Sequence, residues 1–178
     1  MTIPGHMIDY ISTRDHRLMR RVHRWRPPKW FRIWMILATR GGDGWLWYGL
    51  SALVLIFEGS TRYAAVTAAW SACSVGAIIF VILKKLTGRK RPNALVPHCW
   101  ATLLPPDQFS FPSGHTITAF AFTIAVGSFF PHLMGVLLFC ALSVATSRIV
   151  LGMHFLSDVV VGAFLGAGLG YAGFVVFT

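Results

Sequence analysis

The sequence predicts an all-α integral membrane protein, a helical bundle with about five or six transmembrane helices and an N-terminal amphipathic interfacial helix. Hydrophobic residues make up 55% of the 178 residues and charged residues only 12%, whereas charged residues are about a quarter of an ordinary soluble domain. The apolar residues also lie in long blocks, which is typical of membrane-spanning helices. We expect a single domain, with residues 1–40 as a basic interfacial segment and residues 41–178 as the transmembrane core.

The N-terminal segment is basic and amphipathic. Apolar residues recur at roughly helical spacing among its positive charges, which are Arg14, Arg17, Arg20, Arg21, Arg24, Arg26 and Lys29. This pattern favours a helix on the membrane surface that Pro27 and Pro28 end. We expect the helix to be an anchor rather than a collector of anionic lipid. The segment does not have the pattern of a cleavable signal peptide.

Residues 29–39 form a short aromatic segment, typical of the membrane interface. As a helix it would reach only about 16 Å, which is too little for a hydrocarbon core of about 30 Å. Residues 41–44, Gly-Gly-Asp-Gly, then break the chain. We expect Asp43 to be a loop residue or helix cap rather than a functional group.

Apolar blocks over residues 45–57, 63–83, 116–130, 133–150 and 159–177 are the predicted spans. Several have about the 17–25 residues that a crossing needs, although the first is short. In the last block, Gly162, Gly166 and Gly170 recur every four residues. This spacing predicts a close approach to another helix.

Three polar clusters lie at ends of these spans, over residues 84–91, 112–115 and 147–158. If the four spans from residue 63 onward all cross, the first cluster follows an ascending span and the second precedes a descending one. The third cluster lies between the next ascending and descending spans. All three clusters should therefore meet at one membrane face, where ionisable residues indicate a functional site.

The residue types in these clusters suit a phosphate group. Lys84, Arg91 and Arg148 supply positive charge and many hydrogen-bond donors. Ser113 and Gly114 come at a predicted helix start, where free backbone N–H groups favour an anion.

Two histidines in these clusters could divide the chemistry of phosphoryl transfer. His154 and Asp158 are four residues apart, so on a helix they would share a face, and the carboxylate could fix the imidazole tautomer. His154 could then attack phosphorus while His115 protonates the departing oxygen.

Other site and partner classes find little support in the sequence. The net charge of +10 would suggest nucleic acid in a soluble chain, but here anionic lipid is the expected partner. The three cysteines are Cys73, Cys99 and Cys140, and they form no disulfide framework or metal motif. We expect no metal and no cofactor, with cationic side chains stabilising the charge. The oligomeric state cannot be deduced from the sequence.

Three motifs in this chain resemble a known family. They are Lys84-x6-Arg91-Pro92, Pro112-Ser113-Gly114-His115 and Ser147-Arg148-x5-His154-x3-Asp158. Together they are similar to the signature motifs of the type 2 phosphatidic acid phosphatases, which are membrane lipid phosphatases. The resemblance runs from about residue 63 to the C-terminus, and no motif residue departs from the pattern.

The resemblance implies a role for each motif residue. His154 would be the nucleophile that forms a phosphohistidine, Asp158 would orient it, and His115 would be the general acid. The residues implied to bind phosphoryl oxygens are Lys84, Arg91, Ser113, Gly114 and Arg148, and the family needs no metal. We expect Lys85, Arg89 and Lys90 to be solvated or to face headgroups, and we leave His98 unassigned.

The favoured function is hydrolysis of a phosphate monoester or pyrophosphate on a lipid, with undecaprenyl pyrophosphate, phosphatidic acid and phosphatidylglycerophosphate as candidate substrates. A phosphotransferase that uses the same phosphohistidine is one alternative, and a catalytically silent lipid-phosphate binding or transport protein is another. We expect a multi-pass plasma (inner) membrane protein. The positive-inside rule favours a cytoplasmic site, but several of the counted cations are explained by phosphate binding. An outward, periplasmic site is therefore weakly favoured, because many bacterial relatives have one.

Overall fold

The structure is a computed structural model, and it describes residues 5–92 and 108–178. The helices are α1 (Gly5–Arg24), α2 (Lys29–Gly42), α3 (Trp45–Phe57), α4 (Arg62–Thr87), α6 (Gly114–Phe129), α7 (Met134–Val150) and α8 (Leu156–Phe177), with a 3-10 turn at Pro131–Leu133 before α7. An isolated antiparallel bridge joins Lys90 to Phe109. The all-α prediction is confirmed, and α3, α4, α6, α7 and α8 fall on the five predicted apolar blocks to within about one turn. His98 and Cys99 lie outside the described residues.

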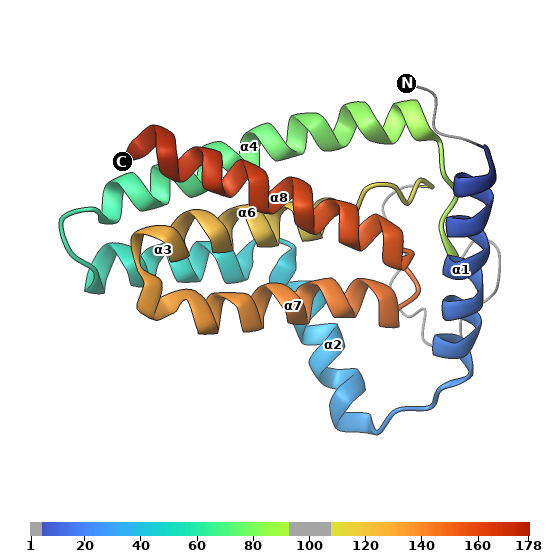
Figure 1. The fold of residues 1–178 in the computed structure, drawn as a ribbon. Coiled ribbons are helices and arrows are strands. Elements are labelled where there is room, and N and C mark those ends of the chain that lie inside the picture. Colours follow the sequence, from blue (N-terminus) through green and yellow to red (C-terminus); the bar gives the residue numbers. More distant parts are fainter. Residues whose placement is uncertain (1–4, 93–107) are drawn as a thin grey trace.

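These five helices run alongside one another, with α6 enclosed by the others (Figure 1). Within the described residues, three stretches are long and apolar enough to cross a membrane: Arg62–Thr87, Pro131–Val150 and Leu156–Phe177. The helices α3 and α6 are apolar but shorter. Many α6 residues are fully buried, including Ala119, Phe122 and Ala125. The helix α6 is therefore the core element against which the longer helices pack.

The predicted close approach of the glycine-bearing helix is confirmed between α8 and α6. A Cβ atom at Gly166 would lie 2.3 Å from the Ile117 carbonyl oxygen, and one at Gly170 would lie 2.4 Å from that of Ala121. Gly162 faces the Ser113 carbonyl in the same way. Because only glycine permits this spacing, the two backbones touch along three successive turns.

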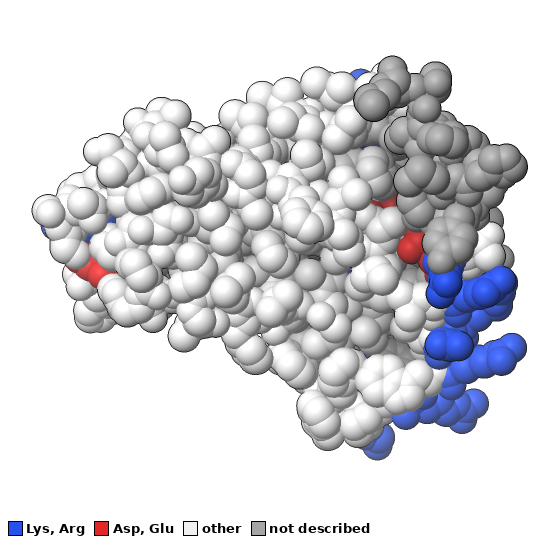
Figure 2. All heavy atoms as spheres, viewed as in Figure 1, with Lys and Arg blue, Asp and Glu red and all other residues white. Residues whose placement is uncertain are grey.

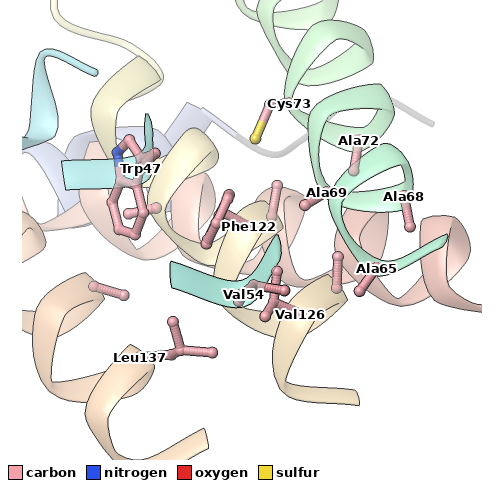
Figure 3. Packing of buried hydrophobic residues seen from close by; sticks show 14 of the residues in the cluster. Trp47, Val54, Ala65, Ala68, Ala69, Ala72, Cys73, Phe122, Val126 and Leu137 are labelled. Carbon is pink, nitrogen blue, oxygen red and sulfur yellow. The ribbon is translucent and has the colours of Figure 1, made fainter. Parts of the chain in front are cut away.

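Alanine, branched aliphatic and aromatic side chains together fill the rest of the core (Figure 3). Alanines of α4, among them Ala65, Ala68 and Ala69, are fully buried. Larger groups fill the space beside them, with the Trp47 and Phe122 rings 5.3 Å apart. This packing holds α3 and α4 on α6 and so fixes the walls of the cavity described below.

At one end of the bundle α4 and α7 finish and α6 and α8 begin (Figure 1). The helix α1 lies across this end, with Asp15 and Met19 buried against the bundle. Its basic side chains are exposed and form the blue edge of the molecule (Figure 2). The helix α2 packs on α7, with the Trp34 and Phe139 rings stacked 5.7 Å apart. The interfacial position of α1 stays a prediction.

Candidate active site

A cavity of about 420 Å³ opens at this end of the bundle. Five of the predicted site residues line it: Arg91, Gly114, His115, Arg148 and His154. Asp43 lines it as well, and its apolar walls come mainly from α3 and α4, with Trp47, Tyr48, Trp70 and Phe80. The three sequence clusters therefore do converge on one end of the fold, as the count of spans predicted.

His154 lies in the tight connection between α7 and α8. Gly152 adopts a φ of 69°, a left-handed conformation that favours glycine. The backbone N–H groups of Met153 and His154 then both donate to the Arg148 carbonyl oxygen, each at 3.0 Å. This turn folds the chain back so that the buried His154 side chain points into the cavity that Arg148 also lines.

Both ring nitrogens of His154 have partners, and the two contacts require the same tautomer. Nδ1 lies 2.6 Å from the Ser110 carbonyl oxygen, which can only accept, so Nδ1 carries the proton. Nε2 lies 3.2 Å from Nη1 of Arg91, which can only donate, so Nε2 presents its lone pair. Burial lowers the pKa of His154 to about 4, and the cations Arg148 and Arg91 act in the same direction. The imidazole is therefore neutral near pH 7, with its free lone pair on Nε2.

The expected contact between His154 and Asp158 is present, but the helical geometry expected for it is wrong. The helix α8 begins at Leu156, so the two residues do not share a helical face. The Asp158 carboxylate is 3.8 Å from Nδ1 of His154, beyond hydrogen-bond distance. One of its oxygens accepts from the Phe155 backbone N–H at 2.9 Å. Asp158 therefore acts on His154 by charge at short range, while Ser110 holds the proton.

The expectation that Arg89 is solvated or faces lipid headgroups is also wrong. Its guanidinium donates to the buried Asp158 carboxylate at 2.7 Å and to Asp15 of α1 at 2.7 Å. The sequence offered no signal for this contact, because Asp15 and Arg89 lie far apart in the chain. Lys85 and Lys90 are exposed, as expected.

His115 has a carboxylate partner that the sequence did not identify. The Asp43 carboxylate lies 2.7 Å from Nε2 of His115. Asp43 does end α2, as expected of a cap, with its backbone N–H on the Arg40 carbonyl, but its side chain turns to the cavity. Gly42 is in contact with the His115 ring, since a Cβ atom there would lie 3.3 Å from Cδ2. The turn between α2 and α3 is therefore built against His115.

Two arginines bring positive charge to the cavity, and both are almost fully buried. Arg91 donates to the Met153 carbonyl oxygen at 2.9 Å. Arg148 donates to the Thr39 hydroxyl at 2.5 Å. A cavity lined by two buried arginines is positively charged, and it therefore suits an anionic ligand such as a phosphate group.

Lys84 and Ser113 lie near the cavity but do not line it. The Lys84 ammonium sits over the Phe80 ring, 4.4 Å from its centre. Ser113 is the N-cap position of α6, and its backbone N–H donates to the Asp158 carbonyl oxygen at 3.1 Å. Ser113 thus joins the start of α6 to the start of α8. Among residues 5–92 and 108–178, no group of three or more His, Cys, Asp or Glu side chains is arranged to hold a metal ion.

The arrangement defines a helical protein with a cationic pocket that contains two histidines. Residues 61–178 match the PAP2 superfamily. The chain belongs to this family, and the resemblance noted in its motifs is confirmed. Together with its apolar helices, this membership makes the chain a membrane protein.

Named relatives include several lipid phosphatases. Lipid A 1-phosphatase of Rhizobium johnstonii is 28% identical over 162 residues, which cover 80% of this chain and 66% of that protein. The decaprenylphosphoryl-5-phosphoribose phosphatase of Mycobacterium tuberculosis is 31% identical over 140 residues, covering 76% of this chain and 77% of that one. The chain therefore spans slightly less than two thirds of the length of the Rhizobium protein.

Solved structures share the fold. The crystal structure of Aquifex aeolicus LpxE matches with a TM-score of 0.72 and 26% identity, over 88% of this chain and 92% of that chain. A PAP2-type phosphatidylglycerolphosphate phosphatase from Bacillus subtilis matches with a TM-score of 0.69 and 22% identity, over 92% of this chain and 84% of that chain. The second likeness concerns the fold alone.

Proposed function

We propose that the protein is a membrane lipid phosphatase that hydrolyses a phosphate monoester or pyrophosphate of a lipid through a phosphohistidine. The observation that carries this proposal is the environment of His154. Its Nε2 lone pair faces a cavity that Arg91, Arg148 and His115 also line, while Nδ1 is held by the Ser110 carbonyl. A neutral imidazole fixed in this way is a nucleophile beside a phosphate-binding pocket.

In the first step, Nε2 of His154 attacks phosphorus and the bond from phosphorus to the lipid oxygen breaks. His115 enters this step as the imidazolium, which the Asp43 carboxylate 2.7 Å away stabilises, and it gives a proton to the departing oxygen. Arg91 and Arg148 hold the phosphoryl oxygens, and an oxygen of the substrate replaces Nε2 as the partner of Arg91. The backbone at the start of α6, from Gly114, adds N–H donors.

In the second step, a water molecule attacks the phosphorus of the phosphohistidine and gives a proton to His115. The bond from phosphorus to Nε2 breaks, which releases inorganic phosphate and restores the neutral His154. Asp158 stabilises the positive charge that the ring bears while it is phosphorylated. Lys84 and Ser113 do not line the cavity. Their proposed role is to support the phosphate site from its edge.

The substrate class follows from the apolar walls beside the cationic end of the cavity. Relatives are named as phosphatases of lipid A, of decaprenylphosphoryl-5-phosphoribose and of undecaprenyl diphosphate. We therefore propose a lipid phosphate that enters from the membrane. The candidate substrates proposed from the sequence remain undecaprenyl pyrophosphate, phosphatidic acid and phosphatidylglycerophosphate.

We further propose that the chain works as one unit, residues 1–40 together with the core 41–178, in the plasma membrane. The sequence weakly favoured an outward-facing site. The position of α1 favours the opposite orientation, because it puts exposed basic residues such as Arg17 and Arg20 at the site end. These side chains have no part in the proposed chemistry, so the positive-inside rule applies to them without bias.

Phosphate release by purified protein from a panel of lipid phosphates tests the function, with His154→Ala as the blank. We expect release that persists in excess chelator and disappears in His154→Ala. Transfer of phosphate to a second lipid would favour the phosphotransferase. Unchanged lipid in every assay would favour a binding or transport protein.

A further inference from the structure

The N-terminal helix is joined to the active-site end by a polar contact of one buried residue. Asp15 of α1 is 5% exposed. Its Oδ1 accepts from the Ser157 backbone N–H at 3.2 Å, and its Oδ2 accepts from the Ser157 hydroxyl. Asp15 therefore receives two hydrogen bonds from the first turn of α8.

Arg89 connects this carboxylate to a second one. Its Nη2 lies 2.7 Å from Oδ2 of Asp15, and its Nη1 lies 2.7 Å from Oδ1 of Asp158. The guanidinium also lies over the Phe155 ring, 4.3 Å from the ring centre. Because the guanidinium is planar and both of its ends are bound, a shift of Asp15 would be passed on to Asp158.

Asp158 is held on both carboxylate oxygens by these surroundings. Oδ1 accepts from Arg89, and Oδ2 accepts from the Phe155 backbone N–H. The residue is fully buried, and its Oδ2 lies 3.8 Å from Nδ1 of His154. A buried carboxylate that lost Arg89 would lack its compensating cation. It would then move or take up a proton, and its charge near His154 would change.

We propose that Asp15 and Arg89 are positioning residues of the phosphatase reaction, and that α1 is therefore part of the active site rather than only an anchor. The proposal rests on the proposed function. Neither residue touches the cavity, so both act through Asp158. They fix the distance and charge of its carboxylate relative to His154, the nucleophile.

The test compares Asp15→Asn and Arg89→Gln with wild type on the best lipid of the panel. For each, kcat should fall about 10–100-fold, which is the range known for residues that hold metal ligands from outside, while KM stays within about threefold of the wild-type value. Arg89→Lys should regain part of the kcat, because it keeps the charge but cannot bridge two carboxylates as a planar group. The double variant should be no slower than the slower single one, since both break one chain of contacts.

Two control variants separate positioning from mere stability. Lys90→Gln removes an exposed charge next to Arg89 and should keep the wild-type kcat. Met19→Ala removes a buried apolar contact of α1 and should lower Tm. If kcat is plotted against Tm, Asp15→Asn should lie well below the line through wild type and Met19→Ala.

The experiment distinguishes a failure of the positioning role from a failure of the proposed phosphatase function. A wild-type protein that releases phosphate from no lipid would end both proposals together. An active wild type with Asp15→Asn and Arg89→Gln within about twofold of it would overturn the positioning role alone. A fall of their kcat only in proportion to Tm would overturn that role as well.

Discussion

At the scale of single residues, the partner of the His154 Nδ1 proton decides how the nucleophile is prepared. The sequence assigned this task to Asp158, but the Ser110 carbonyl oxygen lies 2.6 Å from Nδ1. A backbone carbonyl has no side-chain signature, so spacing within the sequence could not reveal it. The residues of the site could be predicted from their types, whereas the contacts between them depend on loop geometry.

This geometry predicts unequal effects for the two members of the His–Asp pair. His154→Ala should remove phosphate release altogether, because no nucleophile remains. Asp158→Asn should lower kcat by about 100-fold and leave measurable activity, since Ser110 still fixes the tautomer. Steady-state assays of both variants check this. An Asp158→Asn enzyme as inactive as His154→Ala would show that the carboxylate itself holds Nδ1 during the reaction.

A second prediction concerns Asp43, whose carboxylate lies 2.7 Å from Nε2 of His115. Asp43→Asn should lower kcat about tenfold with little change in KM, because the ring of the proposed general acid loses its charged partner. Glu58→Gln is a matched control. Glu58 pairs with His132 at 3.0 Å, but at the opposite end of the bundle, so its loss should leave kcat unchanged. Equal kcat in the two variants would exclude a role for Asp43.

The pH dependence of stability follows from the buried neutral His154. Its pKa is lowered from 6.5 to about 4, so between these values the unfolded chain binds a proton that the folded chain does not. Stability should therefore fall as the pH is lowered through this window, by about 2 kcal/mol between roughly pH 7 and pH 5. The free energy of unfolding of wild type and His154→Asn at both pH values measures the difference. An identical pH dependence in the two proteins would contradict the lowered pKa.

At the scale of helices, the contact between α6 and α8 depends on glycines that the sequence marked by their spacing. The helix positions and the close contact of α8 with another helix could be predicted, because hydrophobic blocks and four-residue glycine spacing are local patterns in the sequence. The docking of α1 on the start of α8 could not, because it depends on Asp15, Arg89 and Ser157, which come from distant parts of the chain.

The contact between α6 and α8 can be tested with two glycine substitutions on α8, one of which is a control. Gly166→Ala should destabilise the protein by about 2–3 kcal/mol, because the new methyl group would meet the backbone of α6, with the Ile117 carbonyl oxygen 2.3 Å away. Gly168→Ala on the same helix meets nothing within 4 Å and should leave stability nearly unchanged. Thermal unfolding in detergent compares the two. Equal Tm values would mean that α8 does not pack on α6 through this face.

At the scale of the whole molecule, the charges are distributed unevenly along the bundle axis. Of the 16 Lys and Arg residues, all within the described ranges, Arg62 alone lies at the end away from the site. The count of basic residues at each membrane face could not include α1 when only the sequence was considered, because the position of α1 relative to the bundle was unknown. With α1 across the site end (Figure 1), five helices lead from that end to the C-terminus, which lies at the opposite end.

This arrangement predicts the topology of the chain in a bacterial inner membrane. If the basic end is cytoplasmic, green fluorescent protein fused to the N-terminus should fluoresce, whereas fused to the C-terminus it should stay dark. Alkaline phosphatase fused to the C-terminus should be active, since it folds only outside the cytoplasm. The reverse pattern would place the site outside, where the sequence weakly put it. Fusions that report the same side for both termini would contradict five crossings, because an odd number of spans must separate the termini. The cytoplasmic outcome would also mean that the lipid phosphate substrate is met in the inner leaflet.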